Sequence, residues 1–469
     1  MKNNKNTLIK AIIAIIIVAV LLTWILPSST FSEGQYSAGE IERVGIFDLS
    51  TYSLMGLSYF ANVFGFLFVL AGFSMFVSKL DAYKKLINSI ASKVKKNELV
   101  FTIASLVFYG VLASLVTDYF VLLIFVPVTI AIMAELKSSK INTFVASFGG
   151  ILLGMLASTY NGYISTIMKQ IFNISKMNSE LIASIGIFVV GAALLVGLLQ
   201  MEKGKKNFEE TENILVSKDE KISKKAKSVS TLPMIIIGVL ISVISILSMI
   251  DWSNAFGVSF FTELATDITE STIGGVTVFK YLIGQSEIAF GEWSLYLISG
   301  LLVINTLILM VIYKVKFDDA LESYIEGFQK YAKGILAIFL IYVVFETSYF
   351  FPVLAGAYNW ILNTFGDNEF TWYIVSIIGS IFTASYEYFV NPLSGFFTAV
   401  GTSHQEVVAL ATQLGYGLVS FFAPTSIVLA FGLTTLNIDY KKYLKFIWKF
   451  LAAMAIISIL VLVILVRVA

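Results

Sequence analysis

Two acidic residues lie inside long apolar stretches of this chain, where a charge is costly. Asp118 stands within SLVTDYFVLLIF and Glu387 within FTASYEYFVNPL. A carboxylate at membrane depth is expensive unless it faces protein or water, so such a residue marks a functional site. Small hydroxyl-bearing residues surround both acids, and each half of the chain contains one of them. The pattern predicts paired broken elements around a transporter's midplane binding site.

The composition sets the class of protein that must hold these acids. Of the 469 residues, 57% are hydrophobic and 13% are charged, and the mean hydropathy is +0.85. Because about 20 apolar residues span a bilayer, the many apolar runs predict an all-α polytopic protein of the cell membrane. The net charge of +1 gives no indication of nucleic-acid binding. We therefore expect the lipid bilayer and a small-molecule substrate as partners.

Other kinds of chemistry find little support in the sequence. The chain has no cysteine and a single histidine, His404, which excludes thiolate chemistry and histidine-rich metal sites. It has no nucleotide-binding motif and no Ser/His pair. We expect no metal, no cofactor and no enzymatic activity. We expect His404 to be an ordinary loop residue.

Lysine is unevenly distributed and predicts an orientation. Residues 202–230 are rich in lysine and are predicted to form a cytoplasmic linker, whereas residues 251–292 contain Lys280 as their only basic residue and are predicted to lie outside. The amphipathic segments 80–98 and 353–369 are predicted to be surface helices. With these assignments the N-terminus is cytoplasmic and the C-terminus extracellular.

Breaks in the apolar stretches predict the topology. Residues 99–135 and 371–400 each break near the middle and are predicted to be re-entrant hairpins, with tips near Ser114–Tyr119 and Ser385–Asn391. Residues 141–175 and 405–433 are too long for ordinary spans and are interrupted at ASTYNGYIS and SFFAPTS, as unwound helices in a protein-lined cavity are. The prediction is inverted repeats with about nine transmembrane helices, divided as 1–201, the linker 202–230, a connecting helix and extracellular segment 231–292, and 293–469.

An ordered set of short segments carries a family resemblance. They are LTWILPSSTFSEGQYS, VGIFDLS, FGEWSLY and FFAPTSIVLAFGL. With them the chain resembles the YfcC-like branch of the C4-dicarboxylate anaerobic carrier family, in the ion-transporter superfamily of elevator carriers. Some members of that branch are described as basic amino-acid antiporters. The resemblance implies an elevator-type carrier and a homodimer.

The resemblance also implies which residues bind substrate, because hairpin tips and unwound helix middles do so in the superfamily. Those positions are Ser114, Thr117 and Asp118; Ser158, Thr159, Asn161 and Gly162; Ser385, Glu387 and Asn391; and Ser420, Pro424, Thr425 and Ser426. The Ser-Asn-Thr signature of the dicarboxylate members is absent at both tips. This departure weighs against a dicarboxylate substrate and against sodium coupling.

The charge of the predicted site bears on its substrate. A third acid, Glu346, lies in the predicted helix 334–352, and the site contains no arginine to grip an anion. Three carboxylates favour a cation such as arginine, ornithine or lysine. The tyrosines Tyr119, Tyr160 and Tyr386 are available for cation–π contact. The leading hypothesis is an exchanger of cationic amino acids.

Other interpretations of the same residues stay open. Asp118 and Glu387 could cap the half-helices of their hairpins, and Glu346 could pair with a lysine at the outer surface. A C4-dicarboxylate or peptide-fragment carrier, coupled to sodium or protons, is the alternative within the same class. An ion channel is the alternative from another class.

Overall fold

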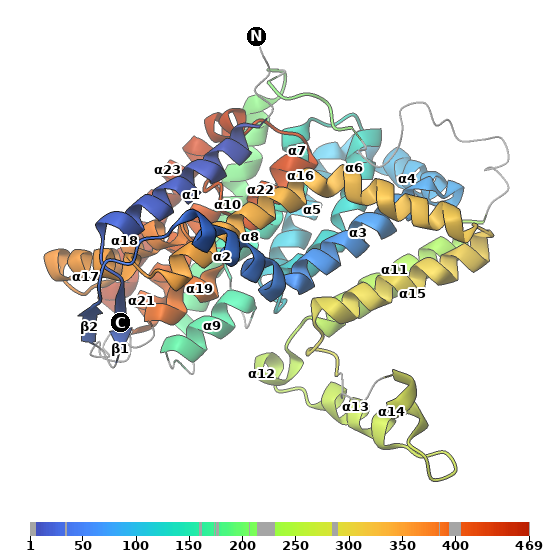
Figure 1. The fold of residues 1–469 in the computed structure, drawn as a ribbon. Helices are drawn as coiled ribbons and strands as arrows, with labels where there is room; N and C mark the ends of the chain where they lie inside the picture. Colours follow the sequence, from blue (N-terminus) through green and yellow to red (C-terminus); the bar gives the residue numbers. More distant parts are fainter. Residues whose placement is uncertain are drawn as a thin grey trace.

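The fold is almost entirely helical, as the composition predicts (Figure 1). The computed structural model describes residues 6–32, 35–158, 162–172, 174, 178–205, 207–212, 230–283, 289–383, 385–393 and 405–468. A small antiparallel sheet joins β1 (Ser29–Ser32) to β2 (Gln35–Ala38), with Thr30 opposite Ser37. The predicted all-α polytopic class is confirmed.

The first half of the chain contains α1 to α10. The bounds are α1 Thr7–Ile25, α2 Ile46–Tyr59, α3 Ala61–Lys79, α4 Asp81–Val94, α5 Glu98–Ala113, η2 Tyr119–Ile124, α6 Val126–Glu135, α7 Lys140–Phe144, α8 Gly150–Leu156, α9 Tyr163–Phe172 and α10 Asn178–Glu202. Between α5 and α6 the chain turns back, and the Tyr109 hydroxyl and Thr129 Oγ1 are 2.8 Å apart across the two helices. The first predicted tip, 114–119, coincides with this turn.

The rest of the chain repeats much of this order of elements. Its bounds are α11 Leu232–Ser248, α12 Trp252–Phe256, α13 Phe260–Glu270, α14 Val278–Ile283, α15 Leu295–Tyr313, α16 Phe317–Phe350, α17 Leu354–Phe365, α18 Glu369–Ser380, α19 Tyr386–Val390, η5 Asn391–Leu393, α21 Gln405–Ser420, α22 Ile427–Thr435 and α23 Tyr440–Val468. Like the first half, it has a helical arm (α18) that precedes a helix broken at 421–426. The predicted second tip, 385–391, forms the short helix α19 and the start of η5, and we call this segment the second tip. The return arm predicted to end at residue 400 lies partly outside the described residues. The helices α12 to α14 project from the body in Figure 1.

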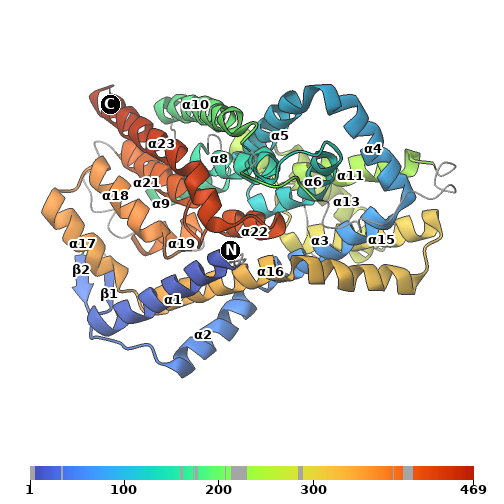
Figure 2. The same ribbon diagram turned by 90° about the horizontal axis from the view of Figure 1, so that it is seen from above.

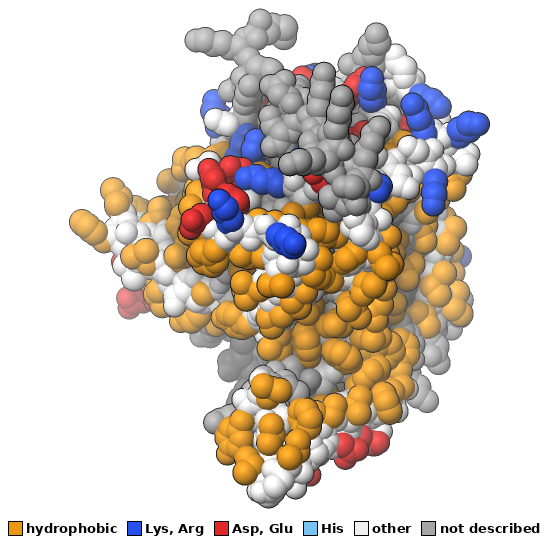
Figure 3. Space-filling view, turned by 90° about the vertical axis from the view of Figure 1, so that its right-hand side faces the viewer, with side chains coloured by type: hydrophobic (Ala, Val, Ile, Leu, Met, Phe, Trp, Pro, Cys, Tyr) orange, Lys and Arg blue, Asp and Glu red, His pale blue; other side chains and the backbone are white. Residues whose placement is uncertain are grey.

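Seven helical stretches of the described residues are long and apolar enough to cross a membrane. They are Thr7–Ile25, Ala61–Lys79, Asp81–Ala113, Leu181–Glu202, Leu295–Tyr313, Phe317–Phe350 and Tyr440–Arg467. Apolar side chains are exposed along them, as on α1, where Leu21 is 53% exposed. Figure 3 shows an orange belt of such side chains with lysines gathered at its upper end. This surface suits a bilayer, in which an apolar exterior is solvated by lipid.

Two apolar stretches have informative boundaries. The stretch 53–77 is divided between α2 and α3, with a break at Phe60. The predicted helix 334–352 is the second half of a longer helix, because α16 begins at Phe317 and is continuous for 34 residues. No proline interrupts this segment, and the change from an amphipathic to an apolar pattern alters what the helix contacts rather than whether it forms.

Glycines allow the main helix pairs to approach closely. A Cβ on Gly327 of α16 would overlap the carbonyl oxygen of Ala71 on α3, and one on Gly154 of α8 would overlap the carbonyl oxygen of Gly110 on α5. Small residues at such contacts are the usual basis of helix packing in membranes. These contacts hold α3 against α16 and α5 against α8.

Part of the predicted linker 202–230 packs against the body of the protein. Residues 207–212 lie across the turn before α7, where Glu210 forms an antiparallel bridge with Ser139. Lys140 Nζ contacts Glu209 Oε2 at 2.7 Å, and Thr143 and Thr211 share a hydrogen bond of 2.6 Å. The stretch 213–229 lies outside the described residues.

Candidate functional site

The first tip is held by backbone partners from other elements. Thr117 donates from its backbone N–H and from Oγ1 to the Met249 carbonyl oxygen, at 2.7 and 3.1 Å. The Tyr163 N–H donates to the Val116 carbonyl oxygen at 3.1 Å. Thr117, predicted as a ligand, therefore anchors the tip to the end of α11.

Two further predicted residues also support this tip. Ser114 Oγ donates to the carbonyl oxygen of Val111, one turn earlier, at 2.8 Å. A Cβ on Gly162 would overlap the carbonyl oxygen of Ser114, so glycine allows the start of α9 to pass the tip. In this conformation Ser114 and Gly162 serve packing and local backbone contacts.

Asp118 caps the short helix η2. Its Oδ1 accepts from the Phe120 N–H at 2.8 Å, so the capping interpretation is confirmed. The same half-buried carboxyl group also lies within electrostatic range of Tyr163 and Tyr342. Capping uses one oxygen and leaves the charge available to a neighbour.

Glu387 lies at the second tip and reaches toward the first. Its Oε2 accepts from the Tyr163 hydroxyl at 3.4 Å, and its Oε1 accepts from Asn391 Nδ2, also at 3.4 Å. Both contacts are long for hydrogen bonds, so neither fully satisfies the carboxylate. Ser385 occupies the N-cap position of α19, beside the hydroxyl of Tyr163. Tyr163 therefore connects the two tips.

A group of tyrosines fills the space between the acids. Its members are Tyr119, Tyr163, Tyr342, Tyr388 and Tyr416. They come from five different elements: η2, α9, α16, α19 and α21. We call this group the tyrosine cluster. It brings phenol rings and hydroxyls close to Asp118 and Glu387.

Ring contacts define the cluster's edges. The rings of Tyr119 and Tyr163 meet edge to face with centroids 5.9 Å apart. The ring of Tyr388 lies 4.3 Å from that of Phe345, which is on α16. The cluster therefore joins the two tips to α16.

Glu346 faces the interior rather than the surface. It is 1% exposed, and its Oε1 has no hydrogen-bond partner among the described residues. Its Cγ would lie 3.1 Å from a Cβ on Gly56, so α2 covers it closely. Tyr388 lies within electrostatic range of both Glu346 and Glu387. The alternative that Glu346 pairs with a surface lysine is wrong for the described residues, among which it has no ion pair.

The helix breaks are stabilised by side chains from neighbouring helices. Gln413 Nε2 donates to the carbonyl oxygens of Leu156 and Ser158, at 3.2 and 3.1 Å. Thr425 Oγ1 donates to the Ile381 carbonyl oxygen at 2.6 Å. These bonds satisfy backbone groups freed by the breaks, which water cannot reach at membrane depth.

Side chains of α23 also donate hydrogen bonds to the backbone of the second break, at 421–426. The hydroxyls of Tyr440 and Tyr443 donate to the carbonyl oxygens of Phe422 and Phe421, at 2.6 and 2.9 Å. Pro424 lies in this turn, and Ser420 Oγ donates to the carbonyl oxygen of Tyr416 at 2.9 Å. Of the residues predicted at the breaks, Thr425 and Ser420 thus have structural contacts.

Three predicted hydroxyls remain available. Ser158 Oγ, Ser385 Oγ and Ser426 Oγ are buried and have no hydrogen-bond partner among the described residues. Ser158 and Ser426 each lie at a helix break, and Ser385 lies at the start of α19. The predicted residues Thr159, Tyr160 and Asn161, and also His404, lie outside the described residues.

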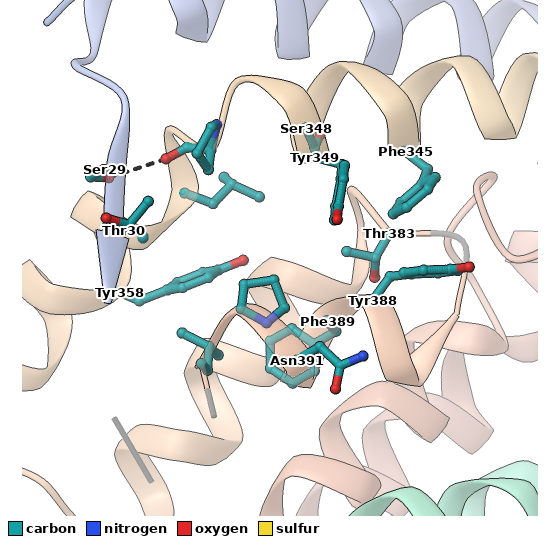
Figure 4. Close-up of a pocket in the computed structure, with 15 residues that line it drawn as sticks. Ser29, Thr30, Phe345, Ser348, Tyr349, Tyr358, Thr383, Tyr388, Phe389 and Asn391 are labelled. Carbon is teal, nitrogen blue, oxygen red and sulfur yellow. Dashed lines mark hydrogen bonds between the residues drawn. The ribbon is translucent and has the colours of Figure 1, made fainter. Parts of the chain in front are cut away.

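A cavity of about 440 Å³ adjoins the second tip (Figure 4). Tyr388 and Asn391 line it from the tip, Tyr349 lines it from α16, and Thr30 lines it from β1. Thr383 also lines it, and its hydroxyl is buried with no partner among the described residues. Ligand sites of this size that combine aromatic walls with a few polar groups are common in proteins. The cavity lies between the tip and the α16 side of the protein.

Sequence reasoning missed several functional candidates. Tyr163, Tyr342, Tyr388 and Tyr416 form most of the cluster, and Gln413 supports the first helix break. Tyr163 and Tyr388 stood within the segments ASTYNGYIS and FTASYEYFVNPL that already marked the site. A tyrosine in an apolar helix is otherwise common, so the sequence offered no comparable signal for Tyr342 or Tyr416.

Replacing Gln413 by leucine should destabilise the protein. The change leaves two carbonyl oxygens without a donor in the interior, at about 1–3 kcal/mol for each unsatisfied group. We expect a clearly lower midpoint of thermal unfolding in detergent. Ser420→Ala is the matched control, because that hydroxyl bonds only within its own helix. Equal midpoints for Gln413→Leu and the wild type would mean that the break needs no side-chain support.

Comparisons with known proteins identify the class. Residues 360–467 match the C4-dicarboxylate anaerobic carrier family, DcuC. No curated protein matches the chain. The Alcanivorax borkumensis YdaH transporter is similar in structure with a TM-score of 0.39 and 11% identity, over 96% of this chain and 97% of its own.

Neisseria gonorrhoeae MtrF, described among a class of antimetabolite efflux pumps, is similar with a TM-score of 0.38 and 12% identity. The similarity covers 97% of this chain and 94% of that one. The carrier-family match and the long apolar helices define the chain as a multi-pass membrane transporter.

Proposed function

We propose that this protein is a secondary transporter that exchanges cationic amino acids such as arginine, ornithine and lysine. The observation that carries the proposal is that all three acids adjoin the tyrosine cluster. Asp118 directly precedes Tyr119, and Glu387 Oε2 lies 3.4 Å from the Tyr163 hydroxyl. Glu346 directly follows Phe345, whose ring lies 4.3 Å from that of Tyr388. None of the three forms an ion pair within the described residues. Glu346 is buried and the other two carboxylates are half-buried, and such groups without a counter-ion favour a cationic ligand that supplies one.

The surroundings suit the rest of such a ligand. Phenol faces attract ammonium and guanidinium groups through cation–π contact, most strongly where water is excluded. The hydroxyl of Thr383 and the amide of Asn391 line the adjoining cavity and could bind the polar end of an amino acid. A long alkyl stem would lie against Phe345 and Tyr388.

The transport mechanism that we propose is an elevator motion. The moving unit comprises residues 99–175 and 371–433, and the remaining helices form the scaffold. Tyr342, Phe345 and Glu346 of α16 contact the site from the scaffold side, while both tips contact it from the moving side. A site built from both sides must open by one unit moving past the other.

Locking the two units together should stop exchange. The pair Phe345→Cys and Tyr388→Cys joins α16 to the second tip, where the native rings are 4.3 Å apart. The chain has no native cysteine, so the two introduced cysteines can form only one disulfide within a chain, and non-reducing electrophoresis separates it from a crosslink between chains. We expect oxidation to abolish exchange in proteoliposomes. Reduction of the disulfide should restore the exchange rate that the double variant had before oxidation.

The control for this lock lies within the scaffold. Phe68→Cys with Phe328→Cys joins α3 to α16, where the rings are 5.6 Å apart. We expect oxidation of this pair to leave exchange intact. Full exchange with α16 and the second tip locked together would contradict the elevator mechanism.

Counterflow in proteoliposomes tests the proposed function. Vesicles loaded with unlabelled arginine should accumulate labelled arginine, ornithine or lysine faster than empty vesicles, because an exchanger is accelerated by substrate on the far side. Labelled succinate and glutamate complete the panel. Uptake of a cation without such acceleration would indicate a channel.

A second candidate is C4-dicarboxylate transport. It is favoured by the family that residues 360–467 match, whose description names that substrate class. Accelerated uptake of succinate, with none of the basic amino acids, would establish this alternative and overturn the first.

A further inference from the structure

A second cavity, of about 570 Å³, opens at the lysine-rich end of the protein. It lies between the start of α5, the turn at 137–139 with the first residues of α7, and the end of α10 with residues 203–204 and 207–208. Figure 2 shows α4, α5 and α10 around this region, on the side away from α1 and α16. Four lysines line it: Lys95, Lys96, Lys137 and Lys203. We call it the lysine cleft.

The acids of the lysine cleft are already engaged. Glu98 Oε1 accepts from Ser138 Oγ at 2.7 Å and from Asn142 Nδ2 at 2.9 Å. Glu202 accepts from Lys205 Nζ at 3.2 Å and from Asn207 Nδ2 at 2.6 Å. None of the four cleft lysines forms an ion pair within the described part of the chain. The cleft therefore presents an excess of positive charge to a ligand.

The floor of the lysine cleft is preorganised. Asn142 also donates to Ser138 Oγ at 2.8 Å, which closes a three-residue network with Glu98. Lys137 has a left-handed backbone, with φ of 57°, in the turn that ends α6. The turn thus places Lys137 beside the start of α5 without depending on a flexible loop.

The lysine cleft continues directly into an apolar surface. On α5, Leu99 is 41% exposed and Val100 63% exposed, and both line the cleft. Ile103 and Val107 extend this exposed apolar stripe along α5, at 37% and 38%. A soluble anion would make no favourable contact with such an apolar stripe, whereas the acyl chains of a lipid would pack against it.

We propose that the lysine cleft binds the head group of an anionic phospholipid, with the acyl chains along the exposed stripe of α5. Basic pockets between membrane helices bind anionic head groups, and each lysine near a membrane surface contributes measurably to that attraction. Lysine serves here as a mobile point charge, which suits a phosphate diester.

The test compares lipid retention by two charge-matched variants of the full chain in detergent. The cleft variant combines Lys96→Gln, Lys137→Gln and Lys203→Gln. The control variant combines Lys314→Gln, Lys316→Gln and Lys330→Gln, which removes the same charge elsewhere. Binding of phosphatidylglycerol and of phosphatidylcholine is measured by native mass spectrometry after delipidation, and folding is checked by gel filtration.

We expect the affinity of the cleft variant for phosphatidylglycerol to be lower than that of the wild type by about tenfold or more. We expect the control variant to bind phosphatidylglycerol as the wild type does, and phosphatidylcholine binding to be the same in all three proteins. Val100→Asn should also weaken phosphatidylglycerol, because it interrupts the apolar stripe. Equal losses in both lysine variants would show a general charge effect and overturn the proposal. A second outcome would also overturn the proposal: millimolar glycerol 3-phosphate displaces the lipid, and Val100→Asn binds phosphatidylglycerol with wild-type affinity. That result would show a site for a soluble phosphate.

Discussion

Replacing Asp118 by asparagine, or Glu387 by glutamine, is expected to abolish transport while the folded protein stays in the membrane. Removing one partner of a buried charge pair costs roughly 2–5 kcal/mol, which corresponds to a loss of binding of about 30-fold or more. Both changes keep the size of the side chain. Counterflow of labelled arginine, with each variant at equal amounts in proteoliposomes, measures the effect.

These substitutions separate charge from capping. An asparagine oxygen at 118 can still accept from the Phe120 N–H, so Asp118→Asn removes the charge and preserves the cap. A glutamine at 387 can still accept from the Tyr163 hydroxyl. We therefore expect normal thermal stability together with lost transport.

The matched control is another capping acid away from the site. Asp48 accepts from the Gly45 N–H at 2.8 Å at the start of α2, and that bond is exposed. Asp48→Asn should transport normally. If Asp118→Asn and Glu387→Gln also transport normally, the two acids make structural contacts only, and the cationic substrate loses its main support.

Replacing Gly327 by alanine is expected to prevent correct assembly of α16 against α3. The added Cβ would overlap the carbonyl oxygen of Ala71, lie 2.6 Å from its carbonyl carbon and 3.0 Å from the Gly72 nitrogen. These are backbone atoms of a helix, so they cannot move aside as the end of a flexible side chain can. Overpacking of this kind costs about 1–3 kcal/mol and sometimes more. Gel filtration and thermal unfolding in detergent should show aggregated or strongly destabilised protein.

Gly300→Ala is the control for this change. Gly300 lies within α15, and a Cβ there would meet nothing within 4 Å. Alanine is favoured over glycine in a helix by about 1 kcal/mol, so this variant should be as stable as the wild type or more so. A Gly327→Ala protein with wild-type stability would show that the close approach of α3 and α16 is dispensable.

The sequence by itself determined the class of the protein and the places where its helices break. Apolar runs of bilayer length and the isolated charges Asp118 and Glu387 are local features, and their meaning does not depend on what they contact. The same is true of ASTYNGYIS and SFFAPTS, because small and hydroxyl-bearing residues in an apolar stretch weaken a helix wherever it lies. In the structure α8 accordingly ends at Leu156 and α9 begins at Tyr163, and a second break lies at 421–426.

Only the tertiary structure decided which polar groups meet. In a membrane protein the faces toward lipid and toward protein are both apolar, so hydropathy does not reveal which side of a helix turns inward. Nothing in the sequence around Glu346 distinguished a surface lysine partner from the buried contact with Gly56. The tyrosines of α9, α16, α19 and α21 converge because four chain segments cross at one point. Gln413 reaches the break after Leu156 across more than 250 residues, since the carbonyls freed there require a donor that the local chain does not provide.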